Sequence, residues 1–201
     1  MKKPKAIAFD LCGVFLDFNP DFLYKDIFPD EKERELFYKN VWTEELDLEN
    51  CKGVPIEECF AIAIGNYPEY EPQIRAWINR FTEMVRPMPE SLKLFDEIVE
   101  MNIPIYLLSN FGSDMFSIIR PLYPIFDHFL DIILSGDVGI NKPDPGYYEY
   151  FLNKHSFKPE EILFVDDRLP NVEGAKKVGI NAVQFISADQ LRKDLEEYGL
   201  F

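Results

Sequence analysis

Four short polar clusters carry the side chains that could do chemistry in this chain. They supply carboxylates, a hydroxyl, an amide and an ammonium group, and they are Asp10-Leu-Cys-Gly-Val, Ser109-Asn110, Asn141-Lys-Pro-Asp and Asp166-Asp167. Carboxylates gathered around one point repel each other unless a hard cation lies between them, and Mg²⁺ prefers such oxygen ligands. The other groups form a cradle for an anion beside that cation, which predicts the handling of a phosphoryl group.

Taken one at a time, each cluster also has a purely structural interpretation. The first is typical of a turn, the second of a helix cap, and the fourth of acidic residues at the start of a helix. A lone lysine in a loop, as in the third, is most often solvated. The functional interpretation depends on their shared position, because the clusters follow predicted strands in this order along the chain.

An alternation of strands and helices positions the four clusters. Short apolar runs predict buried parallel strands at residues 5–10, 103–108, 131–134, 162–165 and 181–185. Helical patterns lie between them at residues 90–101, 113–121, 146–155, 171–178 and 188–198. This alternation predicts an α/β fold with a doubly wound parallel sheet. Because ligands bind at the carboxyl ends of such strands, we expect the clusters to converge on one site.

Residues 18–88 interrupt that alternation. They contain no strong strand pattern, and helical periodicity recurs at residues 30–40, 55–64 and 72–85, with Pro and Gly residues between the helices. We therefore predict two domains. Residues 1–17 and 89–201 form the sheet domain, and residues 18–88 form an all-helical insertion after the first strand.

The composition of the chain limits its partners and its location. The 201 residues carry 36 acidic and 21 basic side chains, a net charge of −15, which disfavours nucleic acid and anionic membranes as partners. A small anionic metabolite is compatible with that charge if the site supplies its own cations. No apolar run has membrane-spanning length, and Asp10 interrupts the N-terminal run that superficially suggests a secretion signal. Three cysteines without a CxxC pair favour reduced thiols and a cytoplasmic protein.

Together the clusters resemble the four motifs of the haloacid dehalogenase superfamily of hydrolases. The motifs are Phe9-Asp-Leu-Cys-Gly-Val-Phe, Leu107-Leu-Ser-Asn, Lys142-Pro-Asp-Pro and Phe164-Val-Asp-Asp, and Asn171-Val-Glu-Gly-Ala is similar to the phosphatase-like branch. The resemblance covers nearly the whole chain. It implies a Rossmann-like core, with residues 18–88 as the helical cap domain of subfamily IA.

The resemblance also implies a mechanism. Asp10 would attack phosphorus and form an aspartyl-phosphate, which water then hydrolyses. The phosphoryl oxygens would be bound by Ser109, with Asn110 adjacent, and their charge would be neutralised by Lys142.

The same resemblance implies a Mg²⁺ site. Its ligands would be Asp10, the main-chain carbonyl of Cys12 and Asp167, with Asp166 beside the cation or bound to it through water. Asp17 and Asn19, where the chain leaves the core for the cap, are candidates for contacting the substrate.

Cys12 is the position at which the chain departs from most phosphatases of the superfamily. They have a second Asp there, which acts as general acid and base. Because residues two apart in an extended segment point the same way, we expect the Cys12 thiol to face the site. A thiol with a pKa of about 8.5 is a poorer proton donor and acceptor than a tuned carboxylate.

Three functions therefore stay open. The favoured one is a magnesium-dependent phosphatase of a small phosphorylated metabolite such as a sugar phosphate. A branch of the family without the second Asp acts on glucose 1-phosphate, and Asp17-Phe-Asn-Pro resembles that branch. The second is a metal-independent 2-haloacid dehalogenase, an enzyme class that typically lacks the pair Asp166-Asp167. The third is a non-catalytic binding or regulatory protein with the same fold.

Overall fold

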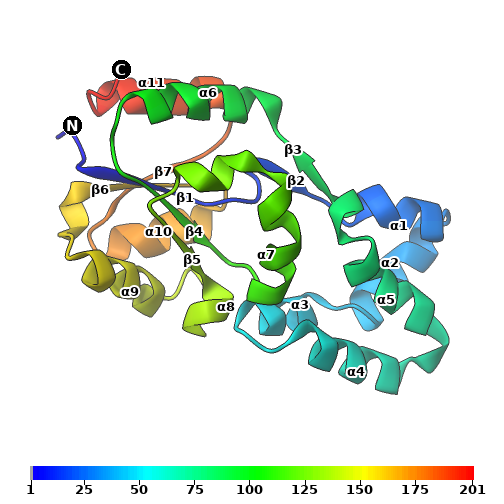
Figure 1. Cartoon of the computed structure of the whole chain (residues 1–201). Helices are drawn as coiled ribbons and strands as arrows, with labels where there is room; N and C mark the ends of the chain where they lie inside the picture. The colour runs from blue at the N-terminus through cyan, green and yellow to red at the C-terminus, as the bar shows by residue number, and fades with distance from the viewer. Residues whose placement is uncertain (1) are drawn as a thin grey trace.

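Apolar strands build a parallel sheet at the centre of the molecule (Figure 1). The computed structural model describes residues 2–201. The strand order is β5-β4-β1-β6-β7, formed by β5 (Asp131–Leu134), β4 (Ile105–Ser109), β1 (Ala6–Phe9), β6 (Ile162–Asp166) and β7 (Asn181–Gln184). The strands β1, β4 and β6 are buried throughout, which explains their almost uninterrupted apolar character. All five predicted strands are confirmed, with ends shifted by two residues or fewer.

Alternate side chains of the central strand face two layers of helices. Ile7 and Phe9 share a core with the helices α6 (Pro89–Glu100), α7 (Ser113–Ile119) and α11 (Ala188–Glu197). Ala6 and Ala8 face the opposite core, against α9 (Pro145–His155) and α10 (Leu169–Lys177). The doubly wound α/β architecture is therefore confirmed. Within residues 2–201, no helix has both the length and the apolar character that crossing a bilayer requires.

The sheet register brings three strand ends to one level. Phe9 lies opposite Leu107 of β4 and Val165 of β6. Asp10, which directly follows β1, and Asp166, the last residue of β6, therefore emerge side by side. Because the chain builds the sheet first on one side of β1 and then on the other, this edge is the topological switch point at which open α/β sheets bind ligands.

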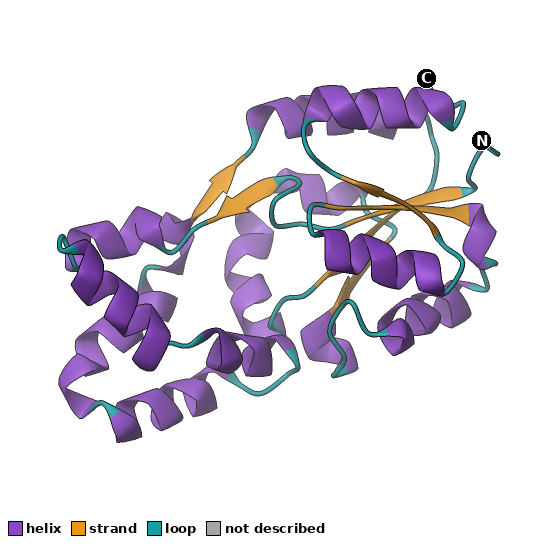
Figure 2. Cartoon of the chain, turned by 180° about the vertical axis from the view of Figure 1, so that it is seen from behind, coloured by secondary structure: helices purple, strands orange, loops and turns teal. Residues whose placement is uncertain are grey.

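A helical insertion extends from this edge of the sheet. Its helices are α1 (Asp21–Ile27), α2 (Glu31–Asn40), α3 (Glu44–Cys51), α4 (Ile56–Asn66) and α5 (Glu71–Asn79). Figure 2 shows the antiparallel ribbon of β2 (Leu16–Phe18) and β3 (Val85–Pro87) through which the chain leaves the sheet domain and returns. The domain boundaries predicted at residues 17/18 and 88/89 fall within or next to this ribbon.

The local structure of the insertion differs from the expectation in two ways. The helix predicted at residues 72–85 ends at Asn79, and a 3₁₀ turn (Phe81–Met84) leads into β3, so the expectation of no strand in this segment is wrong. The sequence pattern also misses α1 and α3. These helices have only 7 and 8 residues, and the ribbon strands have 3 each, so none is long enough to display a clear period.

Hydrogen bonds from the sheet domain hold the helical insertion in place. At the start of α7, the carboxylate of Asp114 accepts from Asn50 Nδ2 at 3.0 Å and from the backbone N–H of Ile56 at 2.7 Å. Asp114 thereby caps α4, whose own N-cap residue makes no side-chain cap. The short helix α8 (Ser135–Val138) adds a bond from the Ser135 hydroxyl to the carbonyl of Cys51.

Candidate active site

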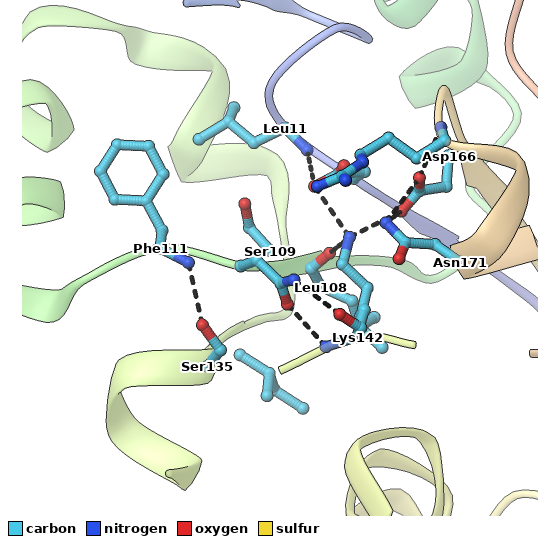
Figure 3. A network of polar contacts seen from close by, with 12 residues as sticks. Leu11, Leu108, Ser109, Phe111, Ser135, Lys142, Asp166 and Asn171 are labelled. Atoms are coloured by element: carbon cyan, nitrogen blue, oxygen red, sulfur yellow. Dashed lines mark hydrogen bonds and ion pairs between the residues drawn. The ribbon is translucent and has the colours of Figure 1, made fainter. Parts of the chain in front are cut away.

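Side chains from the four predicted clusters meet beyond the carboxyl ends of β1, β4 and β6 (Figure 3). Four of them are almost fully buried, with exposed fractions of 6% or less: Asp10, Ser109, Lys142 and Asp166. Beside them lies a cavity of about 290 Å³, which we call the polar cavity. It is lined by Asp10, Cys12, Gly13, Asp17, Phe18, Ser109, Asn110, Asp167, Arg168 and Asn171.

Lys142 is the buried cation that neutralises this acidic cluster. Its Nζ donates to Asp166 Oδ2 at 2.7 Å and to the Leu108 carbonyl at 2.7 Å, and it pairs with Asp10 Oδ1 at 2.9 Å. Its three N–H donors are thus all used. Burial alone would lower the pKa of Lys142, but the charges of Asp10 and Asp166 raise it above its ordinary value. The ammonium group therefore stays charged at neutral pH.

Asp10 presents a carboxylate with one oxygen held and the other available. Oδ1 accepts from the backbone N–H of Leu11 at 2.7 Å as well as from Lys142. The described hydrogen bonds leave Oδ2 unengaged. Burial raises the pKa of Asp10 to about 7; Lys142 opposes this shift and Asp166 adds to it. A further positive charge beside this carboxylate would favour its ionised form.

A cluster of carboxylates fits a divalent cation at this point. Asp10, Asp166 and Asp167 each offer an oxygen, and these oxygens lie within 4.8 Å of one another. Asp167 Oδ1 is buried and has no hydrogen-bond partner in the structure, which is costly for a carboxylate unless a ligand satisfies it. Burial, and then the charge of Asp166, raise the pKa of Asp167. Oxygen ligands in this number and arrangement suit Mg²⁺.

Asp166 contributes to this cluster mainly as a positioning group. Asn171 Nδ2 donates to both of its oxygens, at 2.9 and 3.0 Å, and the backbone N–H of Arg168 donates to Oδ1 at 2.9 Å. With Lys142 on Oδ2 as well, the oxygens of Asp166 are occupied by the protein (Figure 3). Asp10 and Asp167 therefore have the oxygens that are free for direct contact with a cation.

The turn after β1 approaches Asp167 so closely that it requires a glycine. Gly13 has a φ of +78°, in the left-handed region that side chains disfavour. A Cβ at this position would also lie within 2.4 Å of Asp167 Oδ2. The glycine thus lets the Asp10 turn and the Asp167 carboxylate share one small space.

Residues 7–185 match the sequence profile of the haloacid dehalogenase-like hydrolases, which is most of the chain. The chain belongs to this family. It is therefore a hydrolase, and the expectation drawn from its motifs is confirmed. The haloacid dehalogenase-like motifs are the residues that the fold brings to the polar cavity.

Curated relatives and solved structures of the family extend over most of the chain. It is 27% identical over 180 residues to a sesquiterpene phosphatase of Aspergillus oryzae, covering 88% of this chain and 87% of the relative. It is 28% identical over 191 residues to a phosphoglycolate phosphatase of Vibrio cholerae, with 89% and 83% coverage. A structure of a family enzyme from Bacteroides thetaiotaomicron, in complex with magnesium and inorganic phosphate, superposes with a TM-score of 0.69 at 21% identity, covering 92% of this chain and 94% of that one. At this identity the superposition shows a shared Rossmann-like fold.

The structure places Cys12 and Asn110 at the polar cavity in different ways. Burial first, and the charge of Asp10 next, raise the pKa of the Cys12 thiol far above its ordinary value, so the thiol is neutral at physiological pH. Asn110 uses both polar atoms of its side chain on the backbone of Lys142: Nδ2 donates to the carbonyl at 2.9 Å, and Oδ1 accepts from the N–H at 2.7 Å. The Asn110 amide therefore positions the lysine loop, and the Ser109 hydroxyl is the freer of the two groups predicted to bind phosphoryl oxygens.

Asp17 and Asn19, the two candidates for contacting the substrate, differ in position. Asp17 is exposed and lines the polar cavity. Asn19 does not line it; its Oδ1 accepts from the backbone N–H of Asp21 at 2.9 Å, at the start of α1. The structure therefore brings Asp17 to the site and gives Asn19 the role of a local cap.

Two polar residues and one aromatic residue of the site are absent from the predicted set. Asn171 and Arg168 line the polar cavity from the start of α10. A polar side chain within the first turn after the Asp166-Asp167 pair was the available signal for Asn171. Phe18 reaches the cavity from the ribbon, and a ribbon of such short strands leaves no sequence pattern from which its position could be inferred.

Proposed function

We propose that this hydrolase is a magnesium-dependent phosphatase, which acts on a small phosphorylated metabolite through an aspartyl-phosphate on Asp10. The observation that carries the proposal is the carboxylate of Asp167. One of its oxygens lies within 4.8 Å of oxygens of Asp10 and Asp166, its buried Oδ1 has no partner, and Lys142 anchors the neighbouring Asp10. A bound cation would satisfy the unpartnered oxygen of Asp167, and Lys142 orients the carboxylate of Asp10. A cation and an oriented carboxylate are the two groups that transfer of a substrate phosphoryl group requires.

Asp10 is the nucleophile in this proposal. Its carboxylate attacks phosphorus while Leu11 and Lys142 hold Oδ1, so the carboxylate turns little during the reaction. The bond from phosphorus to the alcohol oxygen breaks, and that oxygen takes up a proton from the Cys12 thiol or from water. The product alcohol leaves, and the phosphoryl group remains as a mixed anhydride with Asp10.

Water completes the reaction. It adds to phosphorus and gives up a proton to the Cys12 thiolate or to solvent, the anhydride bond to Asp10 breaks, and inorganic phosphate and the free carboxylate are released. Ser109 binds the phosphoryl oxygens in both steps, and Lys142 stabilises Asp10 as a leaving carboxylate. The neutral Cys12 thiol is a weak acid for the first step, so substrates whose alcohol oxygen leaves easily are favoured.

A bound Mg²⁺ would neutralise charge on the phosphoryl oxygens and keep Asp10 ionised in spite of its burial. Asp10 and Asp167 would hold it, together with the main-chain carbonyl of Cys12. Asp166 would act beside the cation, because its oxygens already accept from Asn171 and Lys142.

The relatives support a phosphatase of small metabolites, since both are named as phosphatases. A net charge of −15 favours a metabolite over nucleic acid as substrate, because a long polyanion meets the whole acidic surface. We keep the prediction that the enzyme is cytoplasmic. A dehalogenase that needs no cation gives no role to the orphaned Asp167 oxygen, so we rank that alternative second.

Asp10→Asn tests the proposal. The amide keeps the shape of the carboxylate but lacks its nucleophilic charge, so hydrolysis of p-nitrophenyl phosphate in Mg²⁺ should fall by at least about 10³-fold. EDTA should stop the wild-type reaction. Circular dichroism of the variant serves as the folding control.

Two results would contradict the proposal. One is substantial phosphatase activity in Asp10→Asn. The other is release of chloride from 2-chloropropionate that continues in EDTA, which would establish the dehalogenase instead.

A further inference from the structure

A second cavity adjoins the polar cavity, between the helical insertion and the sheet domain. Both cavities are lined by Cys12, Phe18 and Asn110, so they meet at these residues. We call the second cavity the apolar chamber. Helix α7 of the sheet domain and helices α3 and α5 of the insertion contribute residues to its lining.

Aromatic rings form a continuous wall of the apolar chamber. The Phe18 ring contacts the rings of Trp77 and Phe81, with centroids 6.0 and 5.7 Å apart. Phe81 in turn contacts Phe111, at 6.1 Å, and Met115 completes the wall from α7. These side chains come from the ribbon, the insertion and the sheet domain, so the wall exists only where the two domains meet.

The two asparagine side chains that line the apolar chamber already form hydrogen bonds within the protein. Asn50 Nδ2 donates to the Val54 carbonyl and to Asp114, each at 3.0 Å. Both polar atoms of Asn110 are bonded to the backbone of Lys142. A polyol inserted here would lose hydrogen bonds to water and gain few in return, which disfavours it.

The charge of the apolar chamber also disfavours substrates that carry a second anionic group. Within residues 2–201 it is lined by one carboxylate, Asp47, and by no lysine or arginine. Burial, and then the nearby Glu44, raise the pKa of Asp47 to about 6, so this group is largely ionised at pH 7. A second anionic group on the substrate would meet this carboxylate without a cation to offset it.

We propose that the apolar chamber binds the carbon skeleton of the substrate, and that this skeleton is an uncharged hydrocarbon or aryl group. This inference rests on the proposed phosphatase function. Because attacking and leaving oxygens lie roughly in line across phosphorus, a phosphoryl group held at Asp10 points its alcohol away from the sheet. The insertion lies on that side, and the chamber opens beside the polar cavity through Cys12 and Asn110.

The size of the apolar chamber limits the group it admits. Its volume is about 110 Å³. Apolar cavities of roughly 150 Å³ in other proteins take up benzene. The apolar chamber is smaller than these cavities, so the preferred substrate is the monophosphate of an alcohol whose branched alkyl or aryl group is no larger than one benzene ring. Carboxylated esters such as 2-phosphoglycolate are poor substrates.

Three phosphate esters of primary alcohols test this preference: 3-methylbutyl phosphate, glycerol 3-phosphate and 2-phosphoglycolate. With Mg²⁺ and a reducing agent, kcat/KM for the 3-methylbutyl ester should exceed that for the glycerol ester by about tenfold or more, since one methylene group in an apolar pocket is worth about 10- to 200-fold. The glycerol alkoxide is the better leaving group, so intrinsic reactivity works against the expected order. A preference for the glycerol ester or for 2-phosphoglycolate would overturn the inference while leaving the phosphatase proposal intact.

Substitutions on helix α3 show whether the apolar chamber causes the preference. Cys51 lines the chamber, so Cys51→Phe should fill it and lower the ratio of 3-methylbutyl to glycerol ester activity at least about tenfold. Leu48→Phe is the matched control, because Leu48 belongs to the same helix but does not line the chamber, and it should keep the ratio. Asp47→Asn should raise the activity on 2-phosphoglycolate relative to the glycerol ester. An unchanged ratio in Cys51→Phe would contradict the inference.

Binding separates a failure of this inference from a failure of the phosphatase proposal. If none of the three esters is hydrolysed, the phosphatase proposal fails. Calorimetry with the wild-type protein then tests whether the apolar chamber binds the hydrocarbon group. Tighter binding of 3-methylbutyl phosphate than of glycerol 3-phosphate would support it. Equal binding, or no binding of either ester, would overturn it.

Discussion

At the scale of single residues, Lys142 controls the charge of the site. It is 3% exposed and forms ion pairs with two carboxylates, so it offsets part of their mutual repulsion while remaining charged. It cannot also satisfy Asp167, whose Oδ1 has no partner. One buried ammonium against three carboxylates leaves the cluster negative, which is the condition that draws a divalent cation.

Cys12 is the residue that most separates this chain from the usual phosphatase motif, and it gives a prediction. The neutral thiol lies at the junction of both cavities, close to where the alcohol oxygen would depart in the proposed mechanism. Cys12→Asp should supply a general acid there, a role typically worth about 10²–10⁴-fold. Hydrolysis of an alkyl phosphate should gain more than that of p-nitrophenyl phosphate, because an alkoxide needs the proton more.

Measuring both esters in parallel provides the control for this variant. Equal gains would mean that leaving-group protonation is not what changed. A fall in both rates in a folded variant would mean that the site is built around the thiol.

The residues of the site could be predicted from the sequence where they end or directly follow a buried strand. Asp10, Ser109 and Asp166 end or directly follow buried strands, so the sheet itself brings them together. Asn110 lies at the site, but its engagement with the Lys142 backbone could not be foreseen, because that contact depends on how a loop folds 32 residues away. Phe18 was missed for the same physical reason, since its position depends on the ribbon.

At the scale of elements, helix α3 lines the apolar chamber and also affects the stability of the fold. It carries Asp47, Asn50 and Cys51 into the apolar chamber, and three acidic residues lie in its first turn. The sequence pattern does not predict this helix, because its 8 residues include few apolar side chains and are too few to show a clear period. Long helices with one apolar stripe, such as α6 and α11, were predicted almost to their ends.

Asp47→Asn is predicted to stabilise the protein in a pH-dependent manner. The pKa of Asp47 is about 6 in the folded state and near 3.8 when the chain unfolds. The unfolded state therefore loses its proton first as pH rises, and the free energy of unfolding decreases between about pH 4 and pH 6. The loss is at most about 3 kcal/mol and smaller for a half-buried group. The variant should match the wild type near pH 4 and be about 1–2 kcal/mol more stable at pH 7, measured by urea unfolding.

Glu45→Gln is the control for that measurement, because Glu45 is an exposed carboxylate of the same helix turn. It should change stability little at either pH. A difference between Asp47→Asn and wild type that is the same at pH 4 and pH 7 would mean that burial of Asp47 does not penalise its charge.

At the scale of the whole molecule, the insertion and the sheet domain share one hydrophobic core. Tyr24, Phe37 and Trp77 of the insertion belong to the same buried cluster as Phe9 and Phe95 of the sheet domain. The alternation of strands and helices predicted the sheet domain, and its interruption predicted the insertion. The orientation of one against the other was not predictable, because it depends on contacts such as Asn50 with Asp114, which are 64 residues apart.

Asp114 is the group through which this orientation can be tested. Its carboxylate caps helix α4 through the N–H of Ile56 and accepts from the buried Asn50. Asp114→Ala removes a helix cap, worth about 0.5–2 kcal/mol, and takes a partner from a buried amide, so the free energy of unfolding should fall by about 1–3 kcal/mol. Asp127→Ala is the matched control: its carboxylate pairs with Arg120 at 2.6 Å on the surface, where an ion pair is worth about 1 kcal/mol or less. Hydrogen exchange should accelerate in α3 and α4 of Asp114→Ala, but not in α9 and α10. Exchange that accelerates equally in all four helices would mean that Asp114 supports global stability rather than the docking of the insertion.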